Sequence, residues 1–285
     1  MDESLNTQIG HFYDRSTPIW LDTWGEHMHH GYYGPDGREQ KDHRQAQVDL
    51  VEEMLRWGQV DKVEYLLDAG CGIGGSARYL AQRFGAQALG VTLSPVQAKQ
   101  AEQYNKRAGL QARVHVQVRD MMTLSAADRP RRFDLIWSME SAEHIRDKQA
   151  LFKLFYSLLA PGGKFLMATW CHRPVPPALA EKEQTLLEKI YRLYHLPPMV
   201  DRQKLVEFAE KAGFLEIQSA DWSPAVAPFW KAVIRTALRW SSIPGLLRAG
   251  WPTIKGAWAM RYMAQGYQRG VLEFAVVQGR KPHVV

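Results

Sequence analysis

The feature that most constrains the fold of this chain is a glycine turn that joins an apolar strand to a helix. Residues 66–80 read Leu-Leu-Asp-Ala-Gly-Cys-Gly-Ile-Gly-Gly-Ser-Ala-Arg-Tyr-Leu. Gly70, Gly72 and Gly75 match the G-x-G-x-x-G pattern, in which backbone N–H groups and a helix N-terminus face a bound nucleotide. The turn therefore predicts an α/β fold with its ligand at the carboxyl ends of parallel strands.

The rest of the chain repeats this alternation of strand and helix. Such alternation is typical of a parallel sheet covered by helices on both faces. The expected strands are 63–68, 88–92, 114–118, 133–137, 164–169, 214–219 and 271–277, and the helices include 74–84, 95–108, 147–159 and 201–212. We predict a Rossmann-like α/β fold with a mostly parallel sheet of seven strands flanked by helices.

Composition divides the chain into three parts. Residues 1–60 are predicted to form a helical lid, 61–170 the cofactor-binding core, and 171–285 the rest of the sheet. Two segments, 171–200 and 222–266, interrupt this last part, and we expect them to form a helical substrate cap. Between Asp221 and Glu273 there is no acidic residue, but there are seven Lys or Arg and five of the ten tryptophans.

Three positions at strand ends decide between a nicotinamide dinucleotide and S-adenosylmethionine. Asp68 precedes the first glycine, where an acid fits poorly beside a pyrophosphate and well beside the ammonium of an amino-acid tail. Thr92 ends the second strand, where a dinucleotide fold normally offers an acid to the ribose. Asp120 follows the third strand and can accept a hydrogen bond from an adenine amino group. Together these positions favour S-adenosylmethionine.

Further cofactor contacts are expected from the same edge of the sheet. Met121 follows Asp120 and is expected against the adenine, and Ser138 and Glu140 follow the fourth strand. The cofactor-binding residues predicted from the strand ends are Asp68, Gly70, Cys71, Gly72, Thr92, Leu93, Asp120, Met121, Ser138 and Glu140.

Composition and charge exclude several classes of protein. Two cysteines provide no disulfide framework and fit a reducing compartment. No apolar run approaches the roughly 20 residues of a membrane-spanning helix, and the N-terminus lacks the features of a signal or transit peptide. The net charge is +6, but the arginines of the acid-free stretch are interleaved with an apolar helical pattern. We therefore expect no nucleic-acid partner and no secretion.

Segments outside the glycine turn resemble one family. Residues 24–33 read Trp-Gly-Glu-His-Met-His-His-Gly-Tyr-Tyr and residues 137–144 read Trp-Ser-Met-Glu-Ser-Ala-Glu-His, and both resemble gamma-tocopherol methyltransferases. The segments 11–14, 169–173, 221–230 and 266–282 are similar to the same family, so the resemblance covers nearly the whole chain. It implies a class I S-adenosylmethionine-dependent methyltransferase. In such a variant of the class, Thr92 and Gln97 serve the ribose side of the cofactor.

The resemblance also implies the reaction. It indicates methyl transfer from S-adenosylmethionine to a ring carbon of a prenylated phenol, of the type that converts gamma-tocopherol to alpha-tocopherol. Such a transfer is an in-line displacement, which requires the ring carbon at about 3–3.5 Å from the methyl group. A phenolate is a better carbon nucleophile than a phenol, so we expect a base near the hydroxyl. Histidine titrates near neutrality, and the candidate bases are His144, His29 and His172.

Aromatic residues of the N-terminal segment and of the cap are expected to shape the acceptor site. The candidate substrate residues are Tyr13, Trp20, Trp24, His30, Trp222, Phe229 and Trp230. The histidines at 27, 29 and 30 resemble a metal site, but no cysteine or second carboxylate–histidine group accompanies them at ligand spacing. Methyl transfer to a phenol carbon needs no metal, so we predict none.

The basic, tryptophan-rich cap has two interpretations that stay open. Its aromatic side chains can form a core while its basic ones face water, or the cap can build an apolar tunnel that rests on an anionic membrane. A prenylated chromanol is almost insoluble in water, so its enzyme must collect it from lipid. We expect a monomer in the cytoplasm or at the surface of a bacterial, cyanobacterial or plastid membrane.

Two other functions also stay open. Relatives within the same subfamily methylate nitrogen in alkaloids, so the resemblance does not fix the acceptor atom. The chain can also be a non-catalytic lipid- or cofactor-binding module on a methyltransferase scaffold. The intact set of Asp68, Gly70, Gly72 and Asp120 argues against that last function.

Overall fold

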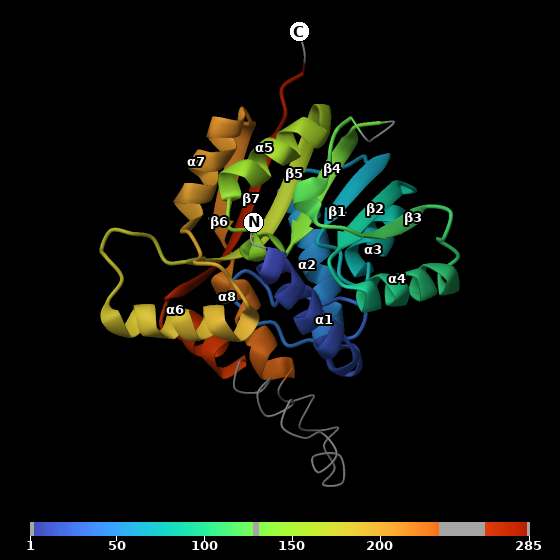
Figure 1. The fold of residues 1–285 in the computed structure, drawn as a ribbon. Coiled ribbons are helices and arrows are strands. Elements are labelled where there is room, and N and C mark those ends of the chain that lie inside the picture. The colour runs from blue at the N-terminus through green and yellow to red at the C-terminus, as the bar shows by residue number, and fades with distance from the viewer. Residues whose placement is uncertain (1–2, 128–130, 234–259, 284–285) are drawn as a thin grey trace, which may run out of the picture.

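The computed structural model describes residues 3–127, 131–233 and 260–283 (Figure 1). At its centre is a seven-stranded sheet with the order β3-β2-β1-β4-β5-β7-β6. The strands are β1 (Tyr65–Ala69), β2 (Gln87–Thr92), β3 (Val114–Val118), β4 (Phe133–Met139), β5 (Leu159–His172), β6 (Leu215–Asp221) and β7 (Leu272–Arg280). Strands β1 to β5 pair in parallel, and β7 runs antiparallel between β5 and β6. This sheet confirms the predicted Rossmann-like fold.

Helices cover both faces of the sheet (Figure 1). They are α1 (Glu3–Trp24), α2 (His43–Trp57), α3 (Gly75–Phe84), α4 (Pro95–Arg107), α5 (Lys148–Leu158), α6 (Glu181–Tyr194), α7 (Arg202–Ala212) and α8 (Ser223–Val226), with 3-10 turns η1 (Met121–Thr123) and η2 (Ala142–His144). Side chains alternate along a strand, so Leu66 and Leu67 point to opposite faces. Leu66 packs in a cluster with α2, α3 and α6, whereas Leu67 packs in a cluster with α5 and α7.

Side-chain caps start several helices where the sequence predicts them. The Ser94 hydroxyl accepts a hydrogen bond from the N–H of Gln97, and Pro95 occupies the first turn of α4, where its missing N–H has no partner to lose. Asp147 caps α5 and Asp201 caps α7 through their carboxylates. These three caps determine the residue at which α4, α5 and α7 begin.

The boundaries agree closely with the predicted ones, and β5 differs most. We predict this strand at 164–169, but it runs from Leu159 to His172. Leu159 pairs with Phe133 before the register shifts, and the far end pairs with β7 as far as His172. Pairing with β4 therefore extends the strand at its start, and pairing with β7 extends it at its end.

The two predicted insertions differ in how much of them the structure describes. The first, 171–200, contains α6. The second, 222–266, begins with α8 and a helical segment from 228 to 233, and continues as a helix from 260 to 268. Residues 234–259, with Trp240, Trp251 and Trp258, lie outside the described residues. Within the described ranges no helix combines the length and the apolarity needed to cross a membrane.

Gly75, the first residue of α3, supports a close approach of two segments. A Cβ atom there would collide with the carbonyl oxygen of Glu26. The N-terminal segment therefore packs directly on the helix that follows the glycine turn.

We predict that Gly75→Ala pushes the 26–30 segment away from α3. Overpacking of this kind costs about 1–3 kcal/mol, measurable in urea unfolding, and hydrogen exchange of the 26–30 amides should accelerate. The matched control is Gly109→Ala, because Gly109 has a positive φ of 69° but no neighbouring atom within 4 Å of the added Cβ. Unchanged exchange of these amides in Gly75→Ala would contradict the predicted contact.

Candidate active site

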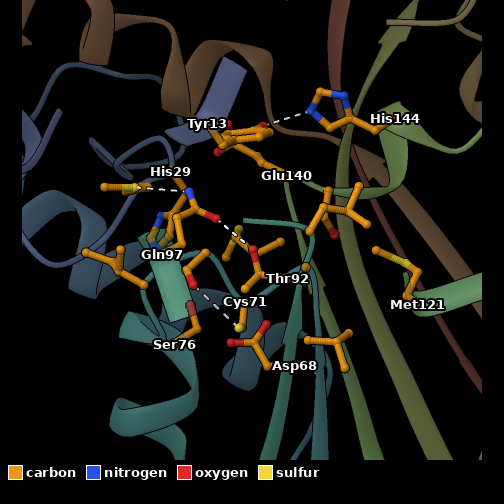
Figure 2. Close-up of a pocket in the computed structure, with 18 of the residues that line it drawn as sticks. Tyr13, His29, Asp68, Cys71, Ser76, Thr92, Gln97, Met121, Glu140 and His144 are labelled. Carbon is orange, nitrogen blue, oxygen red and sulfur yellow. Dashed lines mark hydrogen bonds between the residues drawn. The ribbon is translucent and has the colours of Figure 1, made fainter. Parts of the chain in front are cut away.

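A pocket lies at the carboxyl ends of β1, β2 and β4 (Figure 2). Helix α1 and residues 26–29 contribute one wall, and the strand-end loops contribute the other. The lining residues are Asn6, Ile9, Tyr13, Glu26, His27, Met28, His29, Asp68, Gly70, Cys71, Gly72, Ile73, Gly75, Ser76, Val91, Thr92, Leu93, Gln97, Arg119, Asp120, Met121, Met139, Glu140, Ser141, His144 and Ile145.

The glycine turn forms the floor of this pocket. Gly70 and Gly72 have φ values of 87° and 53°, in the left-handed region that favours glycine. The N–H groups of Gly70 and Cys71 donate to the carbonyl of Val91, which joins the turn to β2. A Cβ atom at Gly70 would collide with the side chain of Ser141, so the loop after β4 also approaches the turn.

Asp68, the last residue but one of β1, lines the pocket and has an oxygen without a partner. The residue is 2% exposed, and its Oδ2 has no hydrogen bond among the described residues. Burial raises the pKa of Asp68 to about 7, although the Ala77 N–H and the Arg78 guanidinium act in the opposite direction. A buried, unpartnered carboxylate is stabilised by a cation, so the ammonium of an S-adenosylmethionine tail fits this end.

The predicted ribose-side residues hold each other in place. Thr92 Oγ1 donates to Gln97 Oε1 at 2.8 Å, and Gln97 is only 3% exposed. The N–H of Ser94 donates to the same Thr92 hydroxyl at 3.2 Å. Two uncharged side chains therefore occupy the place where dinucleotide folds put an acid.

Asp120, at the predicted adenine end of the pocket, is hydrogen-bonded to helix α1. Its Oδ1 accepts a hydrogen bond from the N–H of Met122 at 2.9 Å, and its Oδ2 accepts one from Asn6 Nδ2 at 2.9 Å. Met121 lines the pocket beside it. Helix α1 therefore closes over this end through Asn6.

Tyr13 and His144 form a pair at the end of the pocket that lies away from Asp68 (Figure 2). The Tyr13 hydroxyl lies 2.8 Å from His144 Nε2. Burial, together with Glu143 and Glu140, raises the pKa of Tyr13 far above its usual range. Burial lowers the pKa of His144 to about 4. Near neutral pH the phenol is therefore protonated and donates to a neutral imidazole.

Glu140 lines the pocket and is held by the N-terminal segment. Its Oε1 accepts from the N–H of His30 at 2.6 Å, and its Oε2 lies 2.8 Å from His30 Nδ1. Its backbone has a φ of 48°, which is uncommon outside glycine, and its own N–H donates to the carbonyl of Ala168. The backbone conformation and both carboxylate oxygens are therefore fixed.

A further buried acid, Glu143 in η2, interacts with Glu140 through its charge. Glu143 is 1% exposed and its Oε2 accepts from the Thr169 hydroxyl at 2.9 Å. Burial, and then the charge of Glu140, raise the pKa of Glu143 to about 8. Burial lowers the pKa of Lys148, which donates to the carbonyl of Ile145, to about 8.

The structure places several predicted residues outside the pocket lining. Ser138 is buried behind it and hydrogen-bonds with Ser141. His172 lies at the end of β5 with its Nδ1 at 2.7 Å from the carbonyl of Arg173. Trp222 packs against Tyr32 and Trp57.

The other aromatic candidates pack together next to the pocket. Trp24 lies edge-on to Phe229 and Trp230, and His30 packs against the last two. The side chain of Trp20 lies outside the described part of the structure.

The histidines at positions 27, 29 and 30 differ in their hydrogen-bond partners. His27 Nδ1 lies 3.2 Å from His29 Nε2, and His29 Nδ1 lies 2.8 Å from the carbonyl of His30. Burial lowers the pKa of His27 to about 3 and also lowers that of His29. Among the described residues no group of three metal-ligating side chains converges.

Several lining residues were not predicted. Asn6, Glu26 and Met28 come from the N-terminal segment, and Ser141 comes from the loop after β4. No local motif marks Asn6 or Ser141. The family-like segment 24–33 contains Glu26 and Met28, but their spacing does not show which side chains turn inward.

The fold and the pocket define a class I S-adenosylmethionine-dependent methyltransferase, and the cofactor is S-adenosylmethionine. The family model for mycolic acid cyclopropane synthetase matches residues 5–220. The chain is 42% identical to the chloroplastic tocopherol O-methyltransferase of Arabidopsis thaliana over 292 residues, which is 98% of this chain and 83% of the relative. The chain belongs to the tocopherol methyltransferase family, within the broader group that this model describes. This confirms the predicted family.

Two other similar proteins differ from the tocopherol methyltransferases in their acceptor or in their reaction. Norajmaline N-methyltransferase of Rauvolfia serpentina is 29% identical, with coverage of 96% of this chain and 97% of the relative. The crystal structure of the [4+2]-cyclase SpnF matches with a TM-score of 0.77 and 26% identity, over 98% of this chain and 97% of that one. The same fold therefore occurs with different acceptors and different chemistry.

We predict that cofactor affinity depends on pH through Asp68. Its pKa in the free protein is about 7, and a bound ammonium favours the carboxylate. Below about pH 7 binding must expel a proton, so the Kd for S-adenosylhomocysteine should rise by up to about tenfold per pH unit as the pH falls. Calorimetry between about pH 5 and 7.5 keeps the ligand's amino group protonated.

Asp68→Asn should weaken binding by about 1.5–3 kcal/mol, the range for a hydrogen bond to a charged group, and should remove this pH dependence. Asp36→Asn, which changes an exposed acid remote from the pocket, is the control. If the Asp68→Asn variant keeps the slope of the native protein, another group controls the binding.

Proposed function

We propose that this enzyme transfers a methyl group to a ring carbon of a prenylated phenol or chromanol of the tocopherol type. The observation that carries the proposal is the division of the pocket into two ends. Asp68 offers an unpartnered carboxylate at one end, and Tyr13, Glu140 and His144 gather at the other (Figure 2). The 42% identity to a plant tocopherol O-methyltransferase supports the class of acceptor.

Residues at the two ends of the pocket would have different roles in the reaction. S-adenosylmethionine, when bound, supplies the electrophilic methyl group. Asp68, Thr92, Gln97 and Asp120 would hold the cofactor, and the apolar side chains around them exclude water from the site. At the other end a hydrogen-bonding group would orient the phenol and receive its proton, which raises electron density at the ring carbon next to the hydroxyl.

We expect carbon methylation to be seen directly in the product. Incubation with S-adenosylmethionine that carries ¹³C in its methyl group and gamma-tocopherol should give an aryl-methyl signal and a product that keeps its free phenol. Alpha-tocopherol, in which that ring position is already methylated, is the matched control and should not react. A methoxy signal would indicate oxygen as the acceptor, and tight cofactor binding without any product would overturn the proposal.

Nitrogen methylation is the second candidate function. It is favoured by the similarity to norajmaline N-methyltransferase over nearly the full length of both chains. The same labelled cofactor with an alkaloid that carries a secondary amine as acceptor distinguishes the two functions. Turnover on the amine and none on the chromanol would select this second function.

We further propose that residues 1–60 act as a lid and that the monomer collects its acceptor at an anionic membrane surface through the basic cap. Lys231 in that cap and Arg269, which follows it in the same acid-free stretch, are exposed. Because charges at a surface are screened by salt, flotation with anionic vesicles should decrease as salt rises. Lys231→Glu with Arg269→Glu should decrease it further.

The control for flotation is Lys106→Glu with Arg107→Glu, which makes the same change of charge at the end of α4. Flotation that does not depend on salt, or that both double variants reduce equally, would favour a cap whose basic residues only face water.

A further inference from the structure

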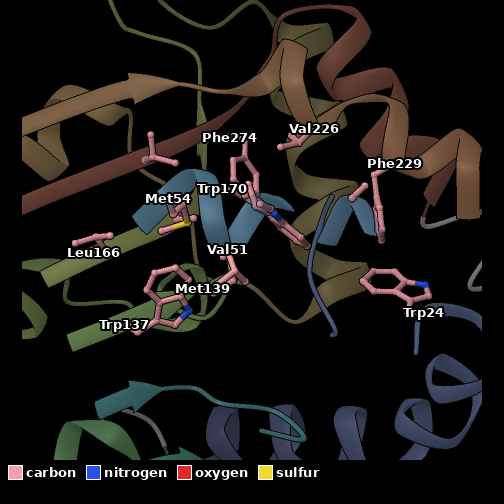
Figure 3. Packing of buried hydrophobic residues seen from close by; sticks show 14 of the residues in the cluster. Trp24, Val51, Met54, Trp137, Met139, Leu166, Trp170, Val226, Phe229 and Phe274 are labelled. Carbon is pink, nitrogen blue, oxygen red and sulfur yellow. The ribbon is translucent and has the colours of Figure 1, made fainter. Parts of the chain in front are cut away.

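His30 occupies the centre of a group of aromatic rings next to the cofactor pocket. Its side chain has no exposed surface. The ring centroids around it lie at 4.9 Å for Trp230, 5.2 Å for Phe229 and Phe274, 5.8 Å for Tyr267 and 6.0 Å for Trp170. We call these five residues the aromatic nest. Figure 3 shows three of them, Trp170, Phe229 and Phe274, in the large buried cluster.

Glu140 determines which nitrogen of His30 carries the proton. A carboxylate oxygen only accepts hydrogen bonds, so the 2.8 Å contact from Glu140 Oε2 requires a hydrogen on Nδ1. In the neutral imidazole Nε2 is then an acceptor with a free lone pair. The backbone N–H of His30 binds the other oxygen at 2.6 Å, so two donors of one residue hold the carboxylate beside the imidazole.

Nε2 of His30 has no hydrogen-bond partner among the described residues, and the same holds for three donors of the nest. These donors are Nε1 of Trp170, Nε1 of Trp230 and the hydroxyl of Tyr267. Trp170 and Trp230 are 8% and 1% exposed. Buried polar atoms are paired in the large majority of cases, so four orphans on adjoining rings indicate a missing polar group. A hydroxyl can pair with three of these four atoms, because it donates once and accepts twice.

We propose that His30 is the general base of the methyl transfer and that the aromatic nest receives the phenolic hydroxyl of the acceptor. This inference rests on the proposed function. Glu140 orients the imidazole, Nε2 accepts the hydroxyl proton, and the indole N–H groups and the Tyr267 hydroxyl stabilise the oxygen as it gains charge. The rings of Phe229 and Phe274 supply apolar contact for the acceptor ring.

The step balances in atoms and charge. The hydroxyl proton moves to His30 Nε2 while the adjacent ring carbon bonds to the methyl group and the C–S bond breaks, its electron pair staying on sulfur. The ring carbon then loses its own proton to water, and the imidazolium returns a proton to the oxygen. The net change is one methyl group gained by the ring, one neutral thioether formed and one proton released.

The other histidines near the site are less free to accept this proton. His144 Nε2 is already engaged by Tyr13, and both nitrogens of His29 have partners, in His27 and in the carbonyl of His30. Among the described histidines in this pocket or next to it, His30 alone combines a carboxylate on one nitrogen with an unpaired lone pair on the other.

The charged and titratable groups around His30 come from several elements. Glu140 follows β4 and contacts the imidazole directly. Glu143 lies in η2 and interacts through its charge with Glu140 and with Tyr267. His29 directly precedes His30 in the chain. Because His30 is fully buried, the acceptor reaches Nε2 only after rings of the aromatic nest move.

The test compares His30→Asn with the native enzyme on gamma-tocopherol. The amide Nδ2 of Asn reaches the position of Nδ1, so the donor to Glu140 is kept while the base is removed. We expect kcat to fall by about 10²–10⁴-fold, the usual range for general-base catalysis, with an unchanged Kd for S-adenosylhomocysteine. The loss should shrink as pH rises, and it should also shrink for a chromanol made more acidic by a ring fluorine, because both supply the phenolate without the base.

A control separates this role from a structural one. His43→Asn removes another buried imidazole, at the start of α2, and should keep native kcat.

Two outcomes would overturn the inference. One is a His30→Asn enzyme with near-native kcat. The other is a His30→Asn enzyme that binds cofactor normally but gains nothing from higher pH or from the more acidic acceptor, because that pattern shows a structural role alone. Absence of turnover by the native enzyme on any phenol would instead refute the proposed function.

Discussion

The constraint on which this site depends is the free-energy cost of burying carboxylates at the edge of a sheet. An ionised carboxylate without a partner is strongly destabilised away from water. Glu140 gains two donors from His30, and Glu143 gains the Thr169 hydroxyl and a pKa of about 8, so it stays mostly protonated. Asp68 alone of these three keeps an oxygen with no hydrogen bond among the described residues. Two of these acids are thus paired within the protein, and the third keeps an unpaired oxygen on a residue that lines the pocket.

The N-terminal segment supplies the partners that the strand ends lack. Four of its side chains reach four separate places: Asn6 binds Asp120, Asp14 binds Ser94 and His30 binds Glu140 in loops after strands, and Glu26 binds Arg78 in α3. These contacts span between 52 and 114 residues of sequence. The sheet therefore positions the loops, but the site is complete only when α1 and the segment after it are in place.

Sequence patterns predict the sheet and the strand-end residues that line the pocket, because both depend on local rules. Apolar runs, the glycine turn and caps such as Ser94 act over a few residues, and so they suffice to place the strands together with Asp68, Thr92 and Asp120. Residues such as Asn6 and Ser141 reach the pocket only through tertiary packing, which leaves no local signal. The same holds for Trp222, whose place against Tyr32 and Trp57 depends on how the chain returns to α2.

The adjacent residues His29 and His30 show why the rest of the candidate site is difficult to predict from sequence. His29 and His30 are adjacent and chemically identical, yet His29 lines the cofactor pocket and His30 lies among aromatic rings that come from β5, β7 and two stretches of the C-terminal part. The backbone decides which of the two meets Glu140, and the left-handed conformation of Glu140 at φ 48° aims its carboxylate at that imidazole. Glu140 lines the pocket and also binds His30. One residue with a left-handed backbone therefore joins the strand-end residues, which local sequence patterns predict, to the aromatic nest, which only tertiary packing brings together.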